Sequence, residues 1–186
     1  MELTPQEEKM LLSLAHFSIE SGFRPTHKNL PSSEDFPILK TNSGAFVTIT
    51  IKKKLRGCIG YVQTEDELSK TVMDAAYQAA FNDPRFEPLN EDEFPQIKLE
   101  ISILSEPFPL ENYEEIVIGK HGLILEDVGR KALLLPQVPI EHKMNRDQFL
   151  SALCRKAGLY EEYWKIKNLN LKAFTATVFS EEEVLK

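Results

Sequence analysis

The sequence predicts an α+β fold with two halves of similar design. Residues 45–51 and 55–62 are rich in β-branched and aromatic side chains, which predicts a β-hairpin with an exposed lysine-rich connection. A second hairpin is predicted over residues 123–135. Each hairpin is followed by a helical pattern, over residues 64–80 and 145–157. Two hairpin-plus-helix halves, with strands and helices in mixed order, are typical of an α+β protein.

Capping patterns and glycines define the expected helix ends. Three pairs have the capping-box spacing: Thr4 with Glu7, Thr64 with Glu67, and Asn145 with Gln148. Gly22 and Gly158 are expected to end the first and last of these helices.

The remaining segments are predicted as follows. Residues 23–44 form an irregular connection, because they contain several prolines and an Asn-Ser-Gly turn. Residues 97–104 alternate between apolar and polar side chains, which predicts a half-buried strand. Residues 172–179 are predicted to be one last strand, and the acidic run 181–183 a solvated end.

Composition restricts the class of protein. The chain of 186 residues suits one domain, 1–186, or two small lobes that share a core. Its net charge of −7 argues against a surface that tracks nucleic-acid phosphates. The two cysteines match no disulfide framework or zinc spacing, and no leader or membrane span is recognised. We expect a reduced, cytoplasmic protein without a metal or cofactor.

The strongest candidate for a functional site is the segment Leu55-Arg56-Gly57-Cys58-Ile59-Gly60, which combines an arginine, a thiol and two glycines in six residues. On a regular strand Arg56 and Cys58 share a face, and a fixed positive charge beside a thiol favours the nucleophilic thiolate. Gly57 and Gly60 have no side chains that could cover the thiol. Glycine inside a strand indicates a bend of the backbone or the close approach of another group. The alternative is that Cys58 is a small buried hydrophobe.

Four further residues are candidates for chemistry, each with a structural alternative. Asp83 and Arg85 would either pair to stiffen the turn after the second helix or present Arg85 to an anion. Glu100 is a candidate acid or base if its strand face lines a cleft, and otherwise belongs to a solvated face. His121, between Lys120 and Gly122, would reach into a site or be a surface turn residue.

Several motifs in order carry a family resemblance. They are Gly44-Ala45-Phe46-Val47, Leu55 to Gly60, Ala80 to Phe86, Glu100 to Ser105, Lys120 to Leu123, Leu135-Pro136-Gln137-Val138 and Cys154 to Leu159. Together they resemble the AMMECR domain family, whose bacterial and archaeal members are called AmmeMemoRadiSam system protein A. The resemblance covers nearly the whole chain and implies two associated lobes, each a mostly antiparallel sheet with helices packed on it.

The resemblance also implies a site and partners. The site is the element from Leu55 to Gly60, with Gln137 of the Leu-Pro-Gln-Val motif as a further ligand-binding candidate. The implied partners are a Memo-like protein, similar to extradiol dioxygenases, and a radical S-adenosylmethionine enzyme. One departure is Met144, which stands where similar proteins often have tryptophan and would alter a pocket or interface there.

Three functions remain open from the sequence. The first is a binding or accessory role around the element from Leu55 to Gly60, which we favour. The second is an enzyme in which Cys58 is the nucleophile or redox thiol, Arg56 activates it and His121 or Glu100 moves protons. The third is a nucleic-acid-linked regulator, which the net charge of −7 disfavours.

Overall fold

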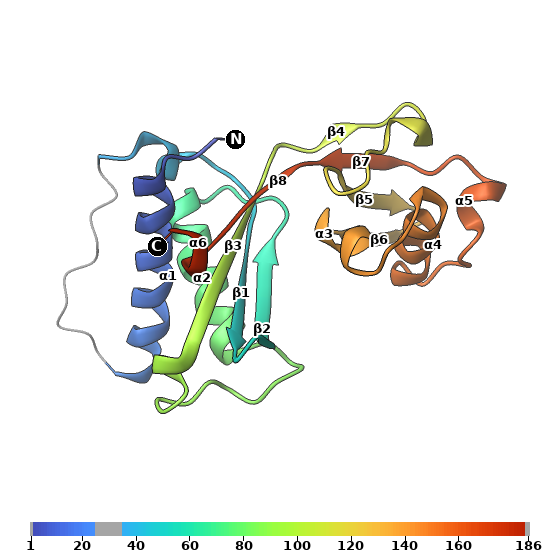
Figure 1. Ribbon diagram of the computed structural model, residues 1–186. Coiled ribbons are helices and arrows are strands. Elements are labelled where there is room, and N and C mark those ends of the chain that lie inside the picture. Colours follow the sequence, from blue (N-terminus) through green and yellow to red (C-terminus); the bar gives the residue numbers. More distant parts are fainter. Residues whose placement is uncertain (1, 25–34, 185–186) are drawn as a thin grey trace. The chain divides into compact units, whose positions relative to one another are not determined.

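The computed structural model describes residues 2–24 and 35–184, which form two compact units. The first unit comprises Met1–Leu104 and Thr177–Lys186, and the second comprises Ser105–Ala176. The second unit is therefore inserted between two strands of the first (Figure 1). Most of the segment predicted to be irregular, residues 25–34, lies outside the described residues.

The first unit contains one four-stranded sheet in the order β2-β1-β3-β8. Its elements are α1 (Pro5–Phe23), η1 (Pro37–Lys40), β1 (Ala45–Ile51), β2 (Lys54–Tyr61), α2 (Leu68–Phe81), η2 (Phe94–Gln96), β3 (Ile97–Leu104), β8 (Ala176–Ser180) and α6 (Glu181–Val184). β1 pairs antiparallel with both β2 and β3.

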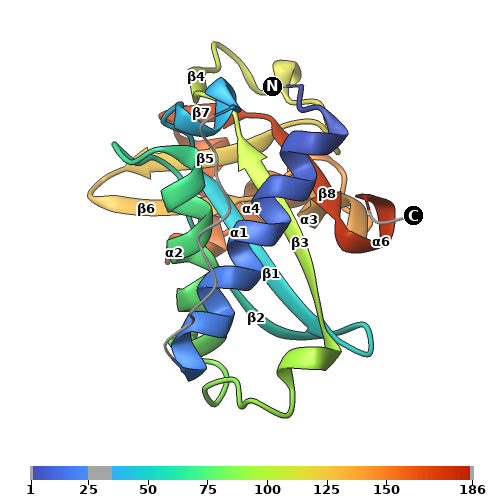
Figure 2. The ribbon, with the colours of Figure 1, turned by 90° about the vertical axis from the view of Figure 1, so that its left-hand side faces the viewer.

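The core of the first unit lies on one face of this sheet. α1 and α2 both cover that face (Figures 1 and 2). Ala45, Val47 and Ile49 of β1 point into this core and are fully buried. The residues between them, among them Phe46 and Thr48, are only half-buried and belong to the opposite face, which we call the open face.

The second unit has its own sheet, in the order β4-β7-β5-β6. Its elements are β4 (Phe108–Pro109), η3 (Tyr113–Glu115), β5 (Gly122–Asp127), β6 (Arg130–Leu134), α3 (Gln137–Glu141), α4 (Arg146–Lys156), α5 (Tyr163–Ile166) and β7 (Leu171–Phe174). α4 packs on β5 and β6 and buries Phe149, Leu150, Leu153 and Cys154. The predicted α+β fold with two sheet-and-helix lobes is therefore confirmed.

Three local predictions were wrong. The last strand is two strands, β7 and β8, which belong to different sheets and are separated by Thr175. Thr64 does not cap α2, because its hydroxyl accepts from the Asp66 amide in a local turn and the helix begins at Leu68. The acidic end is not simply solvated: Glu181 begins α6, is buried, and pairs with His16.

Candidate functional site

A β-bulge at Arg56 decides which way Cys58 faces. The β1–β2 pairing runs regularly from Ile51 opposite Lys54 to Thr50 opposite Leu55, and then resumes with Ile49 opposite Gly57, so Arg56 is the extra residue. After the shift, Cys58 stands opposite Thr48. A one-residue shift exchanges the two faces of a strand. The bulge therefore places Cys58 on the open face instead of the helix-covered face.

Cys58 belongs to a row of polar side chains that crosses three strands. Thr48 is its partner on β1, and Glu100 is the partner of Thr48 on β3. The Thr48 hydroxyl lies 3.3 Å from the Cys58 sulfur and donates to it. Two strand spacings separate Cys58 from Glu100, about 10 Å between Cα atoms. Thr48 therefore contacts the thiol directly, and Glu100 stands one strand farther away.

A hollow of about 330 Å³ lies on the open face beside this row. Thr48, Thr50 and Glu100 contribute to its wall from β1 and β3. Lys53, in the turn of the hairpin, and Lys98 of β3 add two cationic groups to its lining. The hollow thus offers hydroxyl, carboxylate and ammonium groups to a polar ligand.

The loop after α2 bonds the backbone of Cys58 along the free edge of β2. β2 is an edge strand, and the N–H and C=O groups of Cys58 do not pair with β1 but face this loop. The Cys58 amide donates to Asp83 Oδ2 at 2.9 Å, and Arg85 Nη2 donates to the Cys58 carbonyl at 3.1 Å. At Cys58, the backbone groups on the free edge of β2 are therefore hydrogen-bonded.

Asp83 and Arg85 are also bonded to each other. Arg85 Nη2 donates to Asp83 Oδ2 at 2.7 Å, and Arg85 Nε donates to Oδ1 at 2.9 Å. The guanidinium of Arg85 and the Cys58 amide hold the pKa of Asp83 well below its ordinary range. The bond to Asp83, with a smaller contribution from Cys58, raises the pKa of Arg85. The predicted pairing of Asp83 with Arg85 is thus present, and it clamps Cys58.

Arg56 fastens the loop that follows α2, and its guanidinium bonds go to that loop and not to the thiol. Its guanidinium forms a bidentate pair with Glu93, with Nε–Oε1 at 2.8 Å and Nη2–Oε2 at 2.9 Å. It also donates to the carbonyl oxygens of Glu87 and Pro88. This pairing raises the pKa of Arg56 and lowers that of Glu93. The bulge removes Arg56 from the regular strand alternation, so the expectation that Arg56 lies beside the thiol was wrong. The guanidinium that contacts Cys58 is that of Arg85.

Both glycines of the element allow close approaches of backbone. A Cβ on Gly57 would lie 2.0 Å from the Ala79 carbonyl oxygen of α2. A Cβ on Gly60 would lie 2.3 Å from the Ala45 carbonyl oxygen. Gly57 thus faces the helix side of the sheet and lets α2 pack directly on β2.

The remaining candidate residues belong to the second unit. His121 precedes β5, is buried, and packs its ring edge-to-face on Phe108 at 5.5 Å. Burial is the main cause that lowers the pKa of His121. Gln137 is the first residue of α3 and is half-buried. Cys154 lies in the core, where burial raises its pKa.

Two residues that contact the candidate site were not predicted from the sequence. Thr48 gave no signal, because its position opposite Cys58 depends on the bulge. Glu93 did give one: Asn90 and Glu93 have capping-box spacing, and each side chain bonds the other residue's amide. That pattern places a fixed carboxylate within reach of Arg56.

The fold and the open-face row define an α+β protein with an edge-strand cysteine held by an Asp–Arg clamp. A family model described as AMMECR1 matches residues 12–179, and the chain belongs to that family.

Named relatives and a solved structure agree with this assignment. Protein TV1384 of Thermoplasma volcanium is 40% identical over 84% of this chain and 82% of its own length. Protein Mbar_A1807 of Methanosarcina barkeri is 38% identical over 97% of this chain and 93% of its own. The crystal structure of the uncharacterized protein PH0010 from Pyrococcus horikoshii is 33% identical, with a TM-score of 0.84 over 94% of this chain and 91% of that one.

Within the described residues, no helix combines the length and the apolar character needed to cross a membrane.

Proposed function

We propose that this chain is a binding or accessory component that acts with a Memo-like protein and a radical S-adenosylmethionine enzyme. Its binding site is the open face around Cys58, and the chain carries out no turnover of its own. The family resemblance of the sequence suggests the two partners.

The observation that carries a binding role is the way the Cys58 backbone is held. Asp83 and Arg85 bond both the N–H and the C=O group of Cys58, which fixes the edge of the sheet at that residue. Binding sites gain affinity from side chains that are already ordered before the ligand arrives. A fixed thiol and the Thr48 hydroxyl beside it form such a preorganised surface.

The hollow supports a polar occupant. Its lining includes the Lys53 and Lys98 ammonium groups together with hydroxyl groups and the Glu100 carboxylate. Such groups fix the orientation of a ligand or of a partner segment through a few directed bonds. The site therefore suits a small polar ligand or a polar segment presented by the partner.

A Cys58-dependent enzyme is the second candidate, and one contact favours it. The Arg85 guanidinium lies beside Cys58, donates to its carbonyl oxygen at 3.1 Å, and would hold an anionic group of a substrate close to the thiol. A general base must lie within hydrogen-bond reach or one water away. Glu100 is two strand spacings from Cys58, so it would need a substrate group or a water to relay the proton.

The test is a calorimetric titration of this chain with the Memo-like protein and the radical S-adenosylmethionine enzyme from the same genome. Lys53→Glu places a negative charge in the lining of the hollow and should weaken binding about tenfold, equivalent to about 1.4 kcal/mol. Lys52→Glu is a matched control, since Lys52 is the exposed neighbour in the same turn and does not line the hollow. Equal effects of the two substitutions, or no binding by the unsubstituted chain, would refute the proposal.

A further inference from the structure

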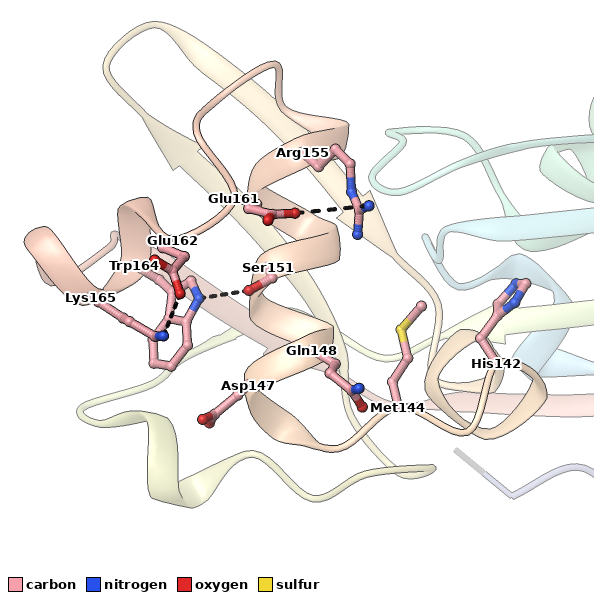
Figure 3. Close-up of a pocket in the computed structure, with 10 residues that line it drawn as sticks. All are labelled: His142, Met144, Asp147, Gln148, Ser151, Arg155, Glu161, Glu162, Trp164 and Lys165. Atoms are coloured by element: carbon pink, nitrogen blue, oxygen red, sulfur yellow. Dashed lines mark hydrogen bonds and ion pairs between the residues drawn. The ribbon is translucent and has the colours of Figure 1, made fainter.

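A second hollow, of about 400 Å³, lies in the second unit along an exposed face of α4 (Figure 3). Asp147, Ser151 and Arg155 line it at intervals of four residues, so they form one stripe of the helix. Eight residues of helix extend about 12 Å. The hollow is therefore an elongated groove that belongs to the second unit, whereas the open face belongs to the first.

One wall of the groove is a tryptophan held in a fixed orientation. Trp164 is the chain's only tryptophan, and its indole Nε1 donates to Ser151 Oγ at 3.0 Å. Its ring packs edge-to-face on Tyr113 with the centroids 5.8 Å apart. Figure 3 shows the indole pointing toward α4, with Lys165 beside the ring. A fixed aromatic face is a ready contact surface for a cation.

The chain already places one of its own cations on this face. The Lys165 ammonium lies 5.4 Å from the centre of the Trp164 ring and 2.6 Å from Glu162 Oε1. The bond to Glu162, with a smaller contribution from Asp147, raises the pKa of Lys165. The groove thus combines an aromatic face with carboxylates that favour positive charge.

We propose that this groove binds an arginine side chain of a partner protein, whose guanidinium replaces the Lys165 ammonium on the Trp164 ring. A guanidinium is planar, stacks on aromatic rings and pairs bidentately with a carboxylate, so it fits Trp164 and Glu162 better than an ammonium does. Lys165 is displaceable because its side chain is 50% exposed, and exposed ion pairs are weak.

The shape of the groove and the charge of the chain favour a protein segment as the source of the arginine. About 12 Å of helix matches three to four residues of extended chain. Met144 adds an apolar, adaptable wall for the neighbouring side chains of such a segment. A net charge of −7 favours encounter with a basic partner.

The fluorescence of Trp164 reports directly on this site, because the chain has no other tryptophan. We would titrate the whole chain at low ionic strength with the peptide acetyl-Gly-Arg-Gly-Gly-amide, and with the same peptide carrying neutral citrulline. The arginine peptide should change the emission with saturation and the citrulline peptide should not. Lys165→Ala should tighten arginine-peptide binding about threefold by removing the internal competitor, whereas Glu162→Gln should weaken it by about the same factor.

The matched control is Lys131→Ala, which removes another exposed lysine paired with a glutamate, at 2.9 Å from Glu126, outside the groove. It should leave the affinity unchanged. Equal responses to the arginine and citrulline peptides would overturn the proposal. So would a Lys165→Ala variant that binds the arginine peptide no more tightly than the unsubstituted chain. Free agmatine binding as tightly as the peptide would show a small-molecule site instead of a protein-segment site.

Discussion

Replacing Asp83 by alanine should destabilise the first unit by about 3 kcal/mol, the upper end of the value of a charge-assisted hydrogen bond. The Asp83 side chain is 2% exposed and accepts hydrogen bonds from the Cys58 amide and from the amide, Nε and Nη2 of Arg85. Its loss would leave the Cys58 amide, at the edge of β2, without its hydrogen-bond acceptor.

The size of this destabilisation depends on which of the former partners of Asp83 can form hydrogen bonds with water after the substitution. The Arg85 side chain is 54% exposed, so most of its lost bonding is replaced by solvent and contributes little. The Cys58 amide follows the buried Gly57 and would lose a charge-assisted hydrogen bond, which is worth about 1.5–3 kcal/mol. For a chain of this length, a loss of about 3 kcal/mol corresponds to a fall in Tm of about 6–12 °C.

Urea denaturation followed by circular dichroism would measure the free energy of unfolding. Hydrogen exchange of the Cys58 amide would measure the local effect, and it should lose protection more than the amides of β3. Asp83→Asn keeps one acceptor oxygen and should cost about half as much. An unfolding free energy of Asp83→Ala within about 0.5 kcal/mol of the unsubstituted chain, the range typical of surface changes, would refute the reasoning.

The same clamp predicts a pH dependence. The folded-state pKa of Asp83 is depressed by Arg85 and the Cys58 amide. Its contribution to stability is therefore complete above the unfolded-state pKa of about 3.9 and is lost as the pH falls toward the depressed folded value. Asp83→Asn should abolish this part of the acid destabilisation. An unchanged acid profile in the variant would count against the clamp.

Three further predictions concern neighbouring features. Arg56→Lys should cost about 1.5 kcal/mol in urea denaturation, because an ammonium cannot reproduce a bidentate pair and two carbonyl bonds. Gly57→Ala should cost about 3 kcal/mol, since its Cβ would lie 2.0 Å from the Ala79 carbonyl oxygen. The hydrogen bond to Asp74 raises the pKa of Tyr61 to about 12, so Asp74→Asn should lower the Tyr61 midpoint in a spectrophotometric titration.

Controls for these predictions lie in the same chain. Arg130→Lys changes an exposed arginine and should be nearly neutral. Gly129→Ala meets no atom within 4 Å and should cost only about 1 kcal/mol for its positive φ. Tyr61→Phe identifies the Tyr61 signal in the titration. A destabilisation of Gly57→Ala no larger than that of Gly129→Ala would contradict the close approach of α2 to β2.

Local patterns predicted most of the fold because they act over a few residues. Both hairpins and the helices α1 and α4 have their signals in adjacent side chains, and the capping boxes at Thr4 and Asn145 are formed as expected. The break at Thr175 was missed because both of its strands continue one β-rich pattern, and only long-range pairing assigns them to different sheets.

The segment that we propose as the site was chosen from the sequence, but its geometry could not be predicted from it. Continuing the pairing of Ile51 with Lys54 without a bulge would place Cys58 opposite Val47, which is fully buried on the helix side. The bulge at Arg56 reverses this orientation of Cys58. The side chain of Arg56 is held by Glu93, which lies in a loop 37 residues away in the sequence. No local propensity reports such a contact, so the role assigned to Arg56 changed while the choice of segment did not.

The central claim is that the open face around Cys58 binds and that the thiol carries out no reaction. Its most direct test is to replace Cys58 by serine and measure both calorimetric affinity for the proposed Memo-like partner and complementation of a strain that lacks this chain. We predict an affinity within about threefold of the original, because serine keeps the approximate size and the polar character of the half-buried cysteine, and full complementation. Retained affinity with lost complementation would contradict the claim and establish Cys58 as a reacting group.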